Sequence, residues 1–288
     1  MLKKLNLIFN KKLLESAIKN NVSAAIEEDL KNNDKTSDIL PAKIKGIAKI
    51  KVKQNAILCG SPWVDYCFRR LDKKIQIKWH FNEGSSIKKG ETICTIIGSY
   101  NQILKGERIA INFLQTLSGT ATTSNLISLK IKKFKTKLFD TRKTIPGLRV
   151  AQKYAVQIGG AFNQRFGLYD QVLIKENHIK LVGSISAIIS MAKENYSLSD
   201  IQIEVENLRE FKEALDLGAT NILLDNFTIE KLTKAVLINK NKAILEASGN
   251  IDINNIIEYA KTKVDRISMG VLTKNIVAID FSMITEIK

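Results

Sequence analysis

The sequence predicts an α/β protein whose carboxyl-terminal part is a parallel β-sheet that could close into a barrel. From about residue 136 onward, apolar runs of strand length alternate with amphipathic stretches whose apolar residues recur at helical spacing. Each expected strand also ends in polar residues. Strands joined by crossover helices build parallel sheets, so this alternation predicts a sheet with helices packed against it.

The alternating part contains six expected strands and five expected helices. The strands are expected at residues 137–140, 171–175, 201–205, 221–226, 243–248 and 266–270. The helices are expected at residues 149–162, 184–195, 207–218, 228–239 and 254–263. In a (β/α) barrel the active site lies at the carboxyl ends of the strands, so the polar residues there are candidates for one shared site.

The first 115 residues follow a different pattern and predict a separate domain. Within it we expect a helix, a loop and two short β segments, at residues 13–30, 31–38, 44–58 and 75–97. Gly84 and Gly90 bracket a turn, as in the hairpins of biotinyl and lipoyl carriers, but the modifiable lysine tip of such carriers is missing. We therefore interpret this segment as a structural hairpin.

The expected domain boundaries follow from this change of pattern. The first domain is expected over residues 1–115 and the barrel over residues 116–274, and residues 275–288 could pack back on the first domain. No Pro-rich or Ser-rich linker separates the two domains.

Composition is that of an ordinary globular protein, with 44% hydrophobic and 26% charged residues, which excludes disordered and collagen-like classes. No apolar run reaches the roughly 18 residues that a membrane-spanning helix requires. The first residues lack the apolar core and cleavage site of a secretory leader, so a cytoplasmic protein without membrane attachment is expected. Cys59, Cys67 and Cys94 match no metal-binding spacing and are expected to be buried free thiols.

The net charge of +16 raises the possibility of nucleic-acid binding. The basic residues are mostly lysines scattered along the chain, and no nucleic-acid-binding motif accompanies them, so we expect no nucleic-acid partner. Arginine is scarce, yet Arg108, Arg142, Arg149 and Arg165 fall between residues 106 and 170. Because a guanidinium binds carboxylate or phosphate in a bidentate way that lysine cannot copy, these arginines indicate an anionic ligand.

The candidate-site segments contain more cations than the nearby carboxylates need. These cations are Arg108, Arg142, Lys143, Arg165 and Lys175. A polyanionic ligand is therefore expected. Glu204 and Asp225, each at a strand end, could hold a hydrated Mg²⁺ that bridges a diphosphate.

Two glycine-containing turns are candidates for phosphate binding. Ser248-Gly249-Asn250 and Gly270 follow expected strands, where exposed backbone N–H groups can hold a phosphate. The two histidines do not suggest a catalytic pair: His80 is interpreted as structural, and His178 as a residue that orients or caps the loop at a strand end.

Seven segments, in order, resemble the quinolinate phosphoribosyltransferases, also called carboxylating nicotinate-nucleotide pyrophosphorylases. They are GERIAINFLQTLSG, DTRKTIPGLR, GLYDQVLIKENHI, IEVEN, LLDN, EASGN and ISMGVLTK. The resemblance runs from about Asp34 to Met283, and the combination of DTRKTIPGLR with LIKENH is highly specific. It implies an incomplete (β/α) barrel, an amino-terminal α/β-sandwich domain and a homodimer.

The resemblance also implies a reaction and a set of site residues. Phosphoribosyl would pass from phosphoribosyl diphosphate to quinolinate with decarboxylation, giving nicotinate mononucleotide for NAD synthesis. Arg108 would enter the neighbouring subunit's site, while Thr141, Arg142, Lys143, Arg165 and Lys175 would bind the carboxylates and phosphates. Glu204 and Asp225 would serve Mg²⁺ and the ribose, and Ser248, Gly249, Asn250 and Gly270 the 5-phosphate. The residues expected to be catalytic are Lys143, Lys175, Glu204 and Asp225.

This chain departs from the family pattern at two places. Gln164 stands where family members usually have His, so an imidazole near the quinolinate pocket has become an amide that cannot carry a positive charge, and weaker quinolinate binding is expected. Lys274 and Asn275 stand where a His is frequent at one of the two positions. The alternatives left open are a paralogous phosphoribosyltransferase-like protein that uses another base, a nucleic-acid-binding protein, and a structural protein without activity.

Overall fold

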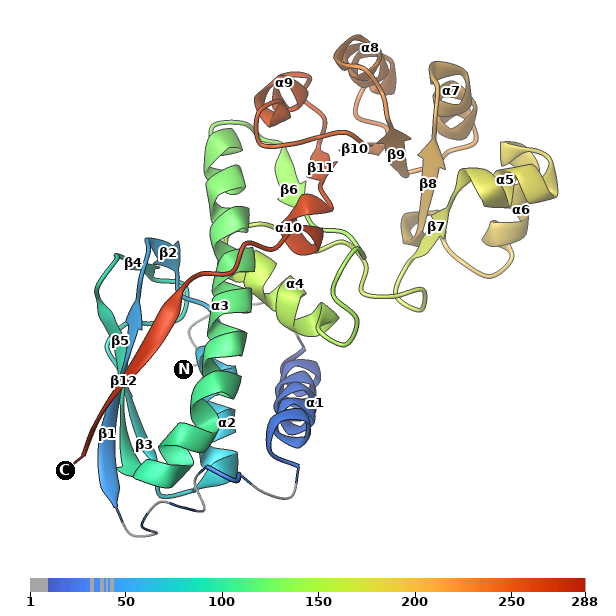
Figure 1. Cartoon of the computed structure of the whole chain (residues 1–288). Coiled ribbons are helices and arrows are strands. Elements are labelled where there is room, and N and C mark those ends of the chain that lie inside the picture. The colour runs from blue at the N-terminus through green and yellow to red at the C-terminus, as the bar shows by residue number, and fades with distance from the viewer. Residues whose placement is uncertain (1–9, 32–33, 37–38, 40, 42–43, 288) are drawn as a thin grey trace. The chain divides into compact units, whose positions relative to one another are not determined.

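The computed structural model describes residues 10–31, 34–36, 39, 41 and 44–287 (Figure 1). The described chain forms two compact units. Unit 1 comprises the residues up to Asn125 together with residues 144–160 and those from Leu272 onward, and unit 2 comprises residues 126–143 and 161–271. The first residues considered for a leader, and part of the loop expected at 31–38, lie outside the described residues.

Unit 1 is built on a four-stranded antiparallel sheet with the strand order β12-β1-β5-β3. Its elements are α1 (Lys11–Leu30), β1 (Lys45–Val52), β2 (Ala56–Ile57), α2 (Ser61–Leu71), β3 (Gln76–Trp79), β4 (Ser86–Ile87), β5 (Thr92–Ser99), α4 (Arg149–Ile158) and β12 (Phe281–Ile287). By sequence, α3 (Tyr100–Ile131) and α10 (Val271–Lys274) contribute to both units. The carboxyl-terminal strand β12 pairs with β1 along its length.

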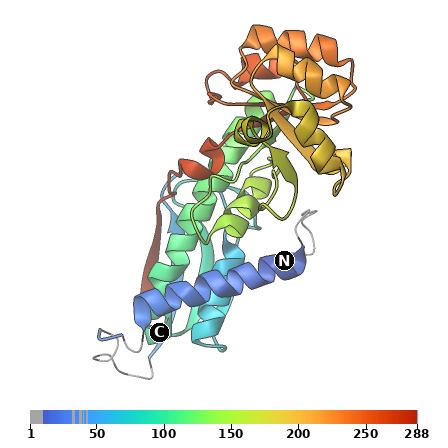
Figure 2. The ribbon, with the colours of Figure 1, turned by 90° about the vertical axis from the view of Figure 1, so that its right-hand side faces the viewer.

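The sequence pattern of unit 1 explains its two apolar cores. In β1, Ala48, Ile50 and Val52 are buried at every second position, as expected for a strand with one covered face. In α1 the buried residues are Leu14, Ile18 and Val22, which recur every four residues and form one helical stripe. Figure 2 shows α1 crossing in front of α2.

The helix α4 differs from its expected role as a barrel helix. Its buried face packs in the α1–α2 core of unit 1, where Tyr154 lies 5.4 Å from Trp63 between ring centroids. The helices α2 and α3 were not anticipated, and α3 runs without a break through the boundary expected at residue 115. The reason is that α3 buries apolar residues over most of its length, including Ile103, Leu114 and Ile127.

Unit 2 contains a parallel six-stranded sheet with the order β6-β11-β10-β9-β8-β7. The strands are β6 (Lys137–Phe139), β7 (Val172–Ile174), β8 (Ile201–Val205), β9 (Asn221–Asp225), β10 (Ile244–Ser248) and β11 (Arg266–Ser268). All six expected strands are present. The described residues show no pairing between β6 and β7, so the expected incomplete (β/α) barrel is confirmed.

Helices follow the strands of unit 2 and lie on one side of the sheet (Figure 1). They are α5 (Glu176–Val182), α6 (Ile185–Lys193), α7 (Leu208–Asp216), α8 (Ile229–Asn239) and α9 (Ile256–Lys261). Side chains of Ser184, Asn207 and Thr228 accept hydrogen bonds from the first turns of α6, α7 and α8, which explains why these helices begin there. The short helix α5 was not anticipated.

The inner face of the sheet is unusually polar, as the alternation along the strands dictates. On β8, Ile203 and Val205 alternate with Gln202 and Glu204, and all four are buried. On β10, Glu246 has no exposed surface. Gln202 Nε2 donates to Glu246 Oε2 over 3.0 Å, so the buried carboxylate is hydrogen-bonded.

No helix in the described part of the chain is long and apolar enough to cross a bilayer. The three cysteines are buried free thiols, as expected.

Candidate active site

A pocket of about 500 Å³ lies at the carboxyl ends of the strands of unit 2. It is lined by Thr141, Arg142, Lys143, Gln164, Arg165, Leu173, Lys175, Glu204, Leu223, Asp225, Ser248 and Ser268. Most of the residues singled out from the sequence are therefore brought together, in a hollow of the size expected for a small-molecule site. Their binding and catalytic roles stay predictions.

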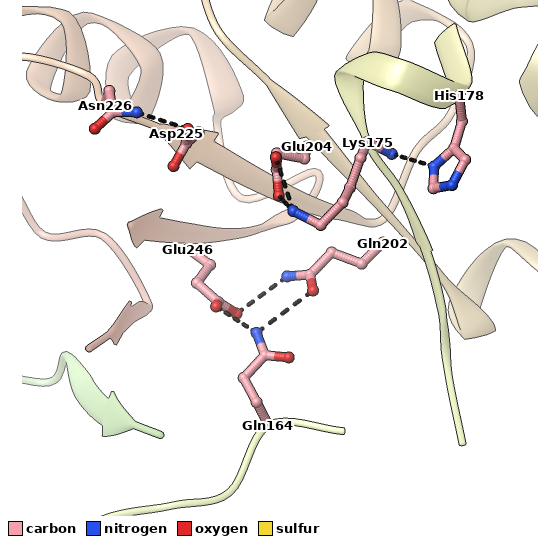
Figure 3. Close-up of polar contacts among 8 residues, drawn as sticks. All are labelled: Gln164, Lys175, His178, Gln202, Glu204, Asp225, Asn226 and Glu246. Carbon is pink, nitrogen blue, oxygen red and sulfur yellow. Dashed lines mark hydrogen bonds and ion pairs between the residues drawn. The ribbon is translucent and has the colours of Figure 1, made fainter. Parts of the chain in front are cut away.

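Lys175 and Glu204 form an ion pair in the pocket. Lys175 Nζ lies 2.8 Å from Glu204 Oε2 and 3.1 Å from Oε1 (Figure 3). The lysine side chain is 44% exposed and the glutamate side chain 10% exposed, so the pair opens toward solvent on the lysine side. His178 Nδ1 accepts the Lys175 backbone N–H at 2.9 Å, and the expected capping role of His178 is confirmed.

Burial shifts the pKa values of the two carboxyl groups in the pocket in the same direction. It raises the pKa of Glu204, while the hydrogen bond and charge of Lys175 oppose that rise. Burial also raises the pKa of Asp225, opposed by Lys175 and Lys143. Asn226 Nδ2 donates to Asp225 Oδ2 at 2.7 Å and holds this carboxylate in place.

Two guanidinium groups stand close together on the cationic side of the pocket. Partial burial lowers the pKa of Arg165, and the nearby charge of Arg142 lowers it further. One Arg165 nitrogen donates to the carbonyl oxygen of Gln171 at 2.8 Å, which fixes the direction of the side chain. Since like charges repel at short range, this arrangement favours a bound anion between or beside the two groups.

The turn after β10 has a backbone conformation that requires glycine at position 249. Gly249 has a φ of +91°, and a Cβ at this position would collide with the side chain of Asn226. Asn250 Nδ2 donates to Asn226 Oδ1 at 3.1 Å. Gly249 and Asn250 thus follow Ser248 of the pocket in a fixed turn, while Gly270 packs closely against Lys143.

Several other residues noted in the sequence lie in unit 1, including Arg149 at the start of α4. Arg108 is exposed on α3, and it does not line the pocket of unit 2. Lys274 and Asn275, at the end of α10, are also exposed.

Sequence reasoning missed three residues that line the pocket. Leu173 and Leu223 lie two positions before Lys175 and Asp225, on the same face of their strands, so the period of two along a strand could have found them. Ser268 bears the same relation to Gly270. Gln164, which the departure from the family pattern had placed near the quinolinate pocket, also lines the pocket, and its amide nitrogen donates to Glu246 (Figure 3).

The described residues contain no group of three or more metal-ligating side chains. Glu204 and Asp225 nevertheless end neighbouring strands and face one pocket. Mg²⁺ usually keeps several waters and is bound by one or two carboxylates plus substrate phosphates, so this pair fits such an ion.

Comparison with known proteins gives a consistent result. The model of the quinolinate phosphoribosyl transferase N-terminal domain matches residues 34–118, and that of the C-terminal domain matches residues 120–284. A probable nicotinate-nucleotide pyrophosphorylase (carboxylating) of Methanocaldococcus jannaschii is 42% identical over 258 residues, 86% of this chain and 89% of the relative. The protein with the same description from Bacillus subtilis is 35% identical over 257 residues, 89% of each chain.

A solved structure agrees with these matches. The nicotinate-nucleotide pyrophosphorylase from Francisella tularensis superposes with a TM-score of 0.91 at 42% identity, covering 94% of this chain and 96% of that one.

Proposed function

Because this chain belongs to the quinolinate phosphoribosyltransferase family, we propose that it converts quinolinate and phosphoribosyl diphosphate to nicotinate mononucleotide, diphosphate and carbon dioxide. This reaction supplies NAD synthesis, and we place it in the cytoplasm. The observation that carries the proposal is the pocket of unit 2, where Arg142, Lys143, Arg165 and Lys175 surround two carboxylates. Such a pocket suits substrates that carry several negative charges.

The reaction requires that the two substrates are positioned against each other and that the charges developing in the transition state are stabilised. The pyridine nitrogen attacks ribose C1 while the C1–O bond to diphosphate breaks and its electron pair leaves with the diphosphate. Lys143 and Lys175 stabilise the anionic groups, and Glu204 and Asp225 stabilise the positive charge that develops on the ribose. Preorganised charges of this kind provide much of the rate enhancement in many enzymes.

Decarboxylation follows and needs only a proton from solvent water. The carboxylate next to the new pyridinium leaves as carbon dioxide, its bonding pair stays on the ring carbon under the pull of the positive nitrogen, and that carbon takes up a proton. Arg142 and Arg165 hold the carboxylates during this step.

Glu204 and Asp225 would also hold Mg²⁺, which when bound neutralises the diphosphate. The side chains fit this role because Lys175 and Asn226 fix the two carboxylates at the mouth of the pocket. Removal of divalent cations with EDTA should abolish turnover, and added Mg²⁺ should restore it. Full activity in EDTA would remove the metal from the proposal.

The assembly is proposed to be a homodimer in which Arg108 of the partner subunit completes each site. Arg108 is exposed on α3 and available for such a contact. The Arg108→Ala and Glu204→Gln variants should each be nearly inactive, whereas their mixture after dissociation and reassociation should regain activity, because one site per mixed dimer carries both native residues. No recovery in verified mixed dimers would exclude a shared site.

Product analysis tests the reaction itself. The purified protein is incubated with Mg²⁺, phosphoribosyl diphosphate and quinolinate, nicotinate or nicotinamide, and the products are identified by mass spectrometry. Nicotinate mononucleotide from quinolinate alone supports the proposal. Product from another base would support the alternative, a phosphoribosyltransferase-like protein with a different base, for which the amide of Gln164 in the pocket is the favouring observation. No product from any base would overturn both.

A further inference from the structure

Ser268 is a buried residue of the pocket whose hydroxyl group has no role in the fold. It ends β11, its exposed fraction is 4%, and it lines the pocket beside the charged residues. Within the described residues, Ser268 Oγ is buried and has no hydrogen-bond partner. A buried hydroxyl without a partner loses its hydration and gains nothing in return, so its presence needs an explanation.

Other buried serines show what a structural hydroxyl does in this chain. Ser118 Oγ donates to the carbonyl oxygen of Cys59 and accepts the Cys59 backbone N–H, both at 3.0 Å. Ser124 Oγ donates to the carbonyl oxygen of Thr120 at 2.8 Å. Ser128 Oγ and Ser282 Oγ are also buried without a partner in the described part of the chain, but neither residue lines the pocket. Ser268 therefore combines an unpartnered hydroxyl with a position in the pocket wall.

The surroundings of Ser268 indicate what its hydroxyl would meet. The parallel pairing of β10 with β11 sets Ala247 opposite Ile267, so Ser268 follows beside Ser248, another residue of the pocket. Two residues further on, a Cβ at Gly270 would lie 2.9 Å from Lys143 Cδ and 3.6 Å from Thr141 Oγ1. Ser268 thus belongs to a wall with hydroxyl groups and a lysine, which is the chemistry of an anion subsite.

We propose that Ser268 is a substrate-binding residue that donates its hydroxyl to an anionic oxygen, either a carboxylate of the base or a phosphate of the phosphoribosyl donor. The inference rests on the proposed function, since it assigns a further residue to that pocket. This role also accounts for the unpartnered Ser268 Oγ, because the bound substrate provides a hydrogen-bond acceptor that the protein does not. A hydroxyl that donates to a charged group makes a stronger bond than one that donates to a neutral group.

The experiment compares Ser268→Ala and Ser268→Cys with the wild-type chain. Dissociation constants for quinolinate and for Mg²⁺ phosphoribosyl diphosphate are measured by titration calorimetry, together with the melting temperature. Both variants should bind one of the two substrates about tenfold more weakly, because each lacks a strong O–H donor and cysteine keeps the side-chain volume. The substrate affected identifies the acceptor as carboxylate or phosphate. The melting temperature of Ser268→Ala should not fall, since no internal hydrogen bond is lost.

Ser118→Ala is the matched control. It removes a buried serine hydroxyl that is bonded within unit 1, so its melting temperature should fall while both dissociation constants stay at the wild-type values. Unchanged binding of both substrates by Ser268→Ala, with wild-type binding intact, would overturn the inference and leave the proposed function standing. Restored binding in Ser268→Cys would assign the effect to shape and also overturn it. Wild-type protein that binds neither substrate would overturn both proposals.

Discussion

Two buried glutamates, Glu83 in unit 1 and Glu204 in unit 2, show how the same side chain serves structure in one place and a site in another. Burial raises the pKa of both carboxyls. Glu83 accepts the backbone N–H groups of Gly60 at 2.7 Å and Ser61 at 3.1 Å, and the hydroxyls of Ser61 and Tyr154. Within the described residues, Glu204 is paired with one ammonium group, Lys175 Nζ, whose side chain is 44% exposed.

The difference lies in where the hydrogen-bond partners come from. The fold itself supplies four hydrogen-bond donors to the Glu83 carboxylate, two of them backbone N–H groups at the start of α2. These four bonds leave the carboxylate no free oxygen lone pair for a ligand. At Glu204 the partner is a partly exposed lysine, whose ammonium group can also contact an anion bound in the pocket. A carboxylate saturated by its own fold is structural, whereas one paired at a cavity wall is a candidate for function.

The largest effect is expected from Lys175→Ala. The change removes the cation beside Glu204 and one of the positive charges of the pocket, and kcat/KM should fall about a thousandfold, as for other preorganised electrostatic groups. Steady-state kinetics with quinolinate measure it. Lys234→Ala is the control, because Lys234 pairs with the exposed Glu230 on α8. A Lys175→Ala variant within tenfold of wild type would contradict the contrast between the two glutamates.

The second-largest effect is expected from Glu83→Ala, which should lower the stability of unit 1. The change leaves two hydroxyls and two backbone N–H groups without their acceptor, so the free energy of unfolding of unit 1 should fall by about 3 kcal/mol. Trp63 and Trp79 are the two tryptophans of the chain and both lie in unit 1, so intrinsic fluorescence during urea denaturation reports on this unit.

At temperatures where the Glu83→Ala variant remains folded, its KM for quinolinate should match that of the wild type. Glu286→Ala is the control, because Glu286 forms an exposed ion pair with Lys49 and its loss should leave unit 1 as stable as before. A Glu83→Ala variant with unchanged urea midpoint would show that the four donors find other acceptors.

The barrel strands and most pocket residues could be predicted from sequence because both depend on local patterns. Apolar runs that end in polar residues mark strands such as β8 and β9, and parallel pairing then collects Glu204 and Asp225 at one edge. The assignment of α4 failed because an amphipathic helix does not reveal which core it covers. Its buried residues pack on Trp63, a contact distant in sequence.

The period of two before Gly270 could have placed Ser268 on the pocket face of its strand, but only the three-dimensional structure shows that its hydroxyl is buried without a partner. Glu83 was missed as well, because its donors at residues 60–61 and 154 converge only in the fold. Residues whose importance arises from distant partners lie beyond local pattern reasoning.

The smallest effect is expected from Gln164→His, which adds a titratable group to the polar interior of unit 2. The Gln164 backbone N–H donates to Asp140 at 2.8 Å, and its side-chain amide donates to the buried Glu246. An imidazole there would face the Glu246 carboxylate, which favours the cationic form. The KM for quinolinate should therefore fall about threefold to tenfold at pH values below the imidazole pKa.

The sign of the pH dependence distinguishes this charge from a change of shape. The imidazolium attracts the dicarboxylate, so the advantage of Gln164→His is present at low pH and disappears as the pH rises through the pKa of the new histidine. Wild-type Gln164 has no group that titrates, and Gln164→Asn is the matched neutral control. Kinetics between about pH 5.5 and 8.5 would measure the difference. Equal KM values for wild type and Gln164→His at every pH would mean that the amide binds quinolinate as well as a cation does. The polar interior of unit 2 would then bind quinolinate through fixed hydrogen bonds and not through charge.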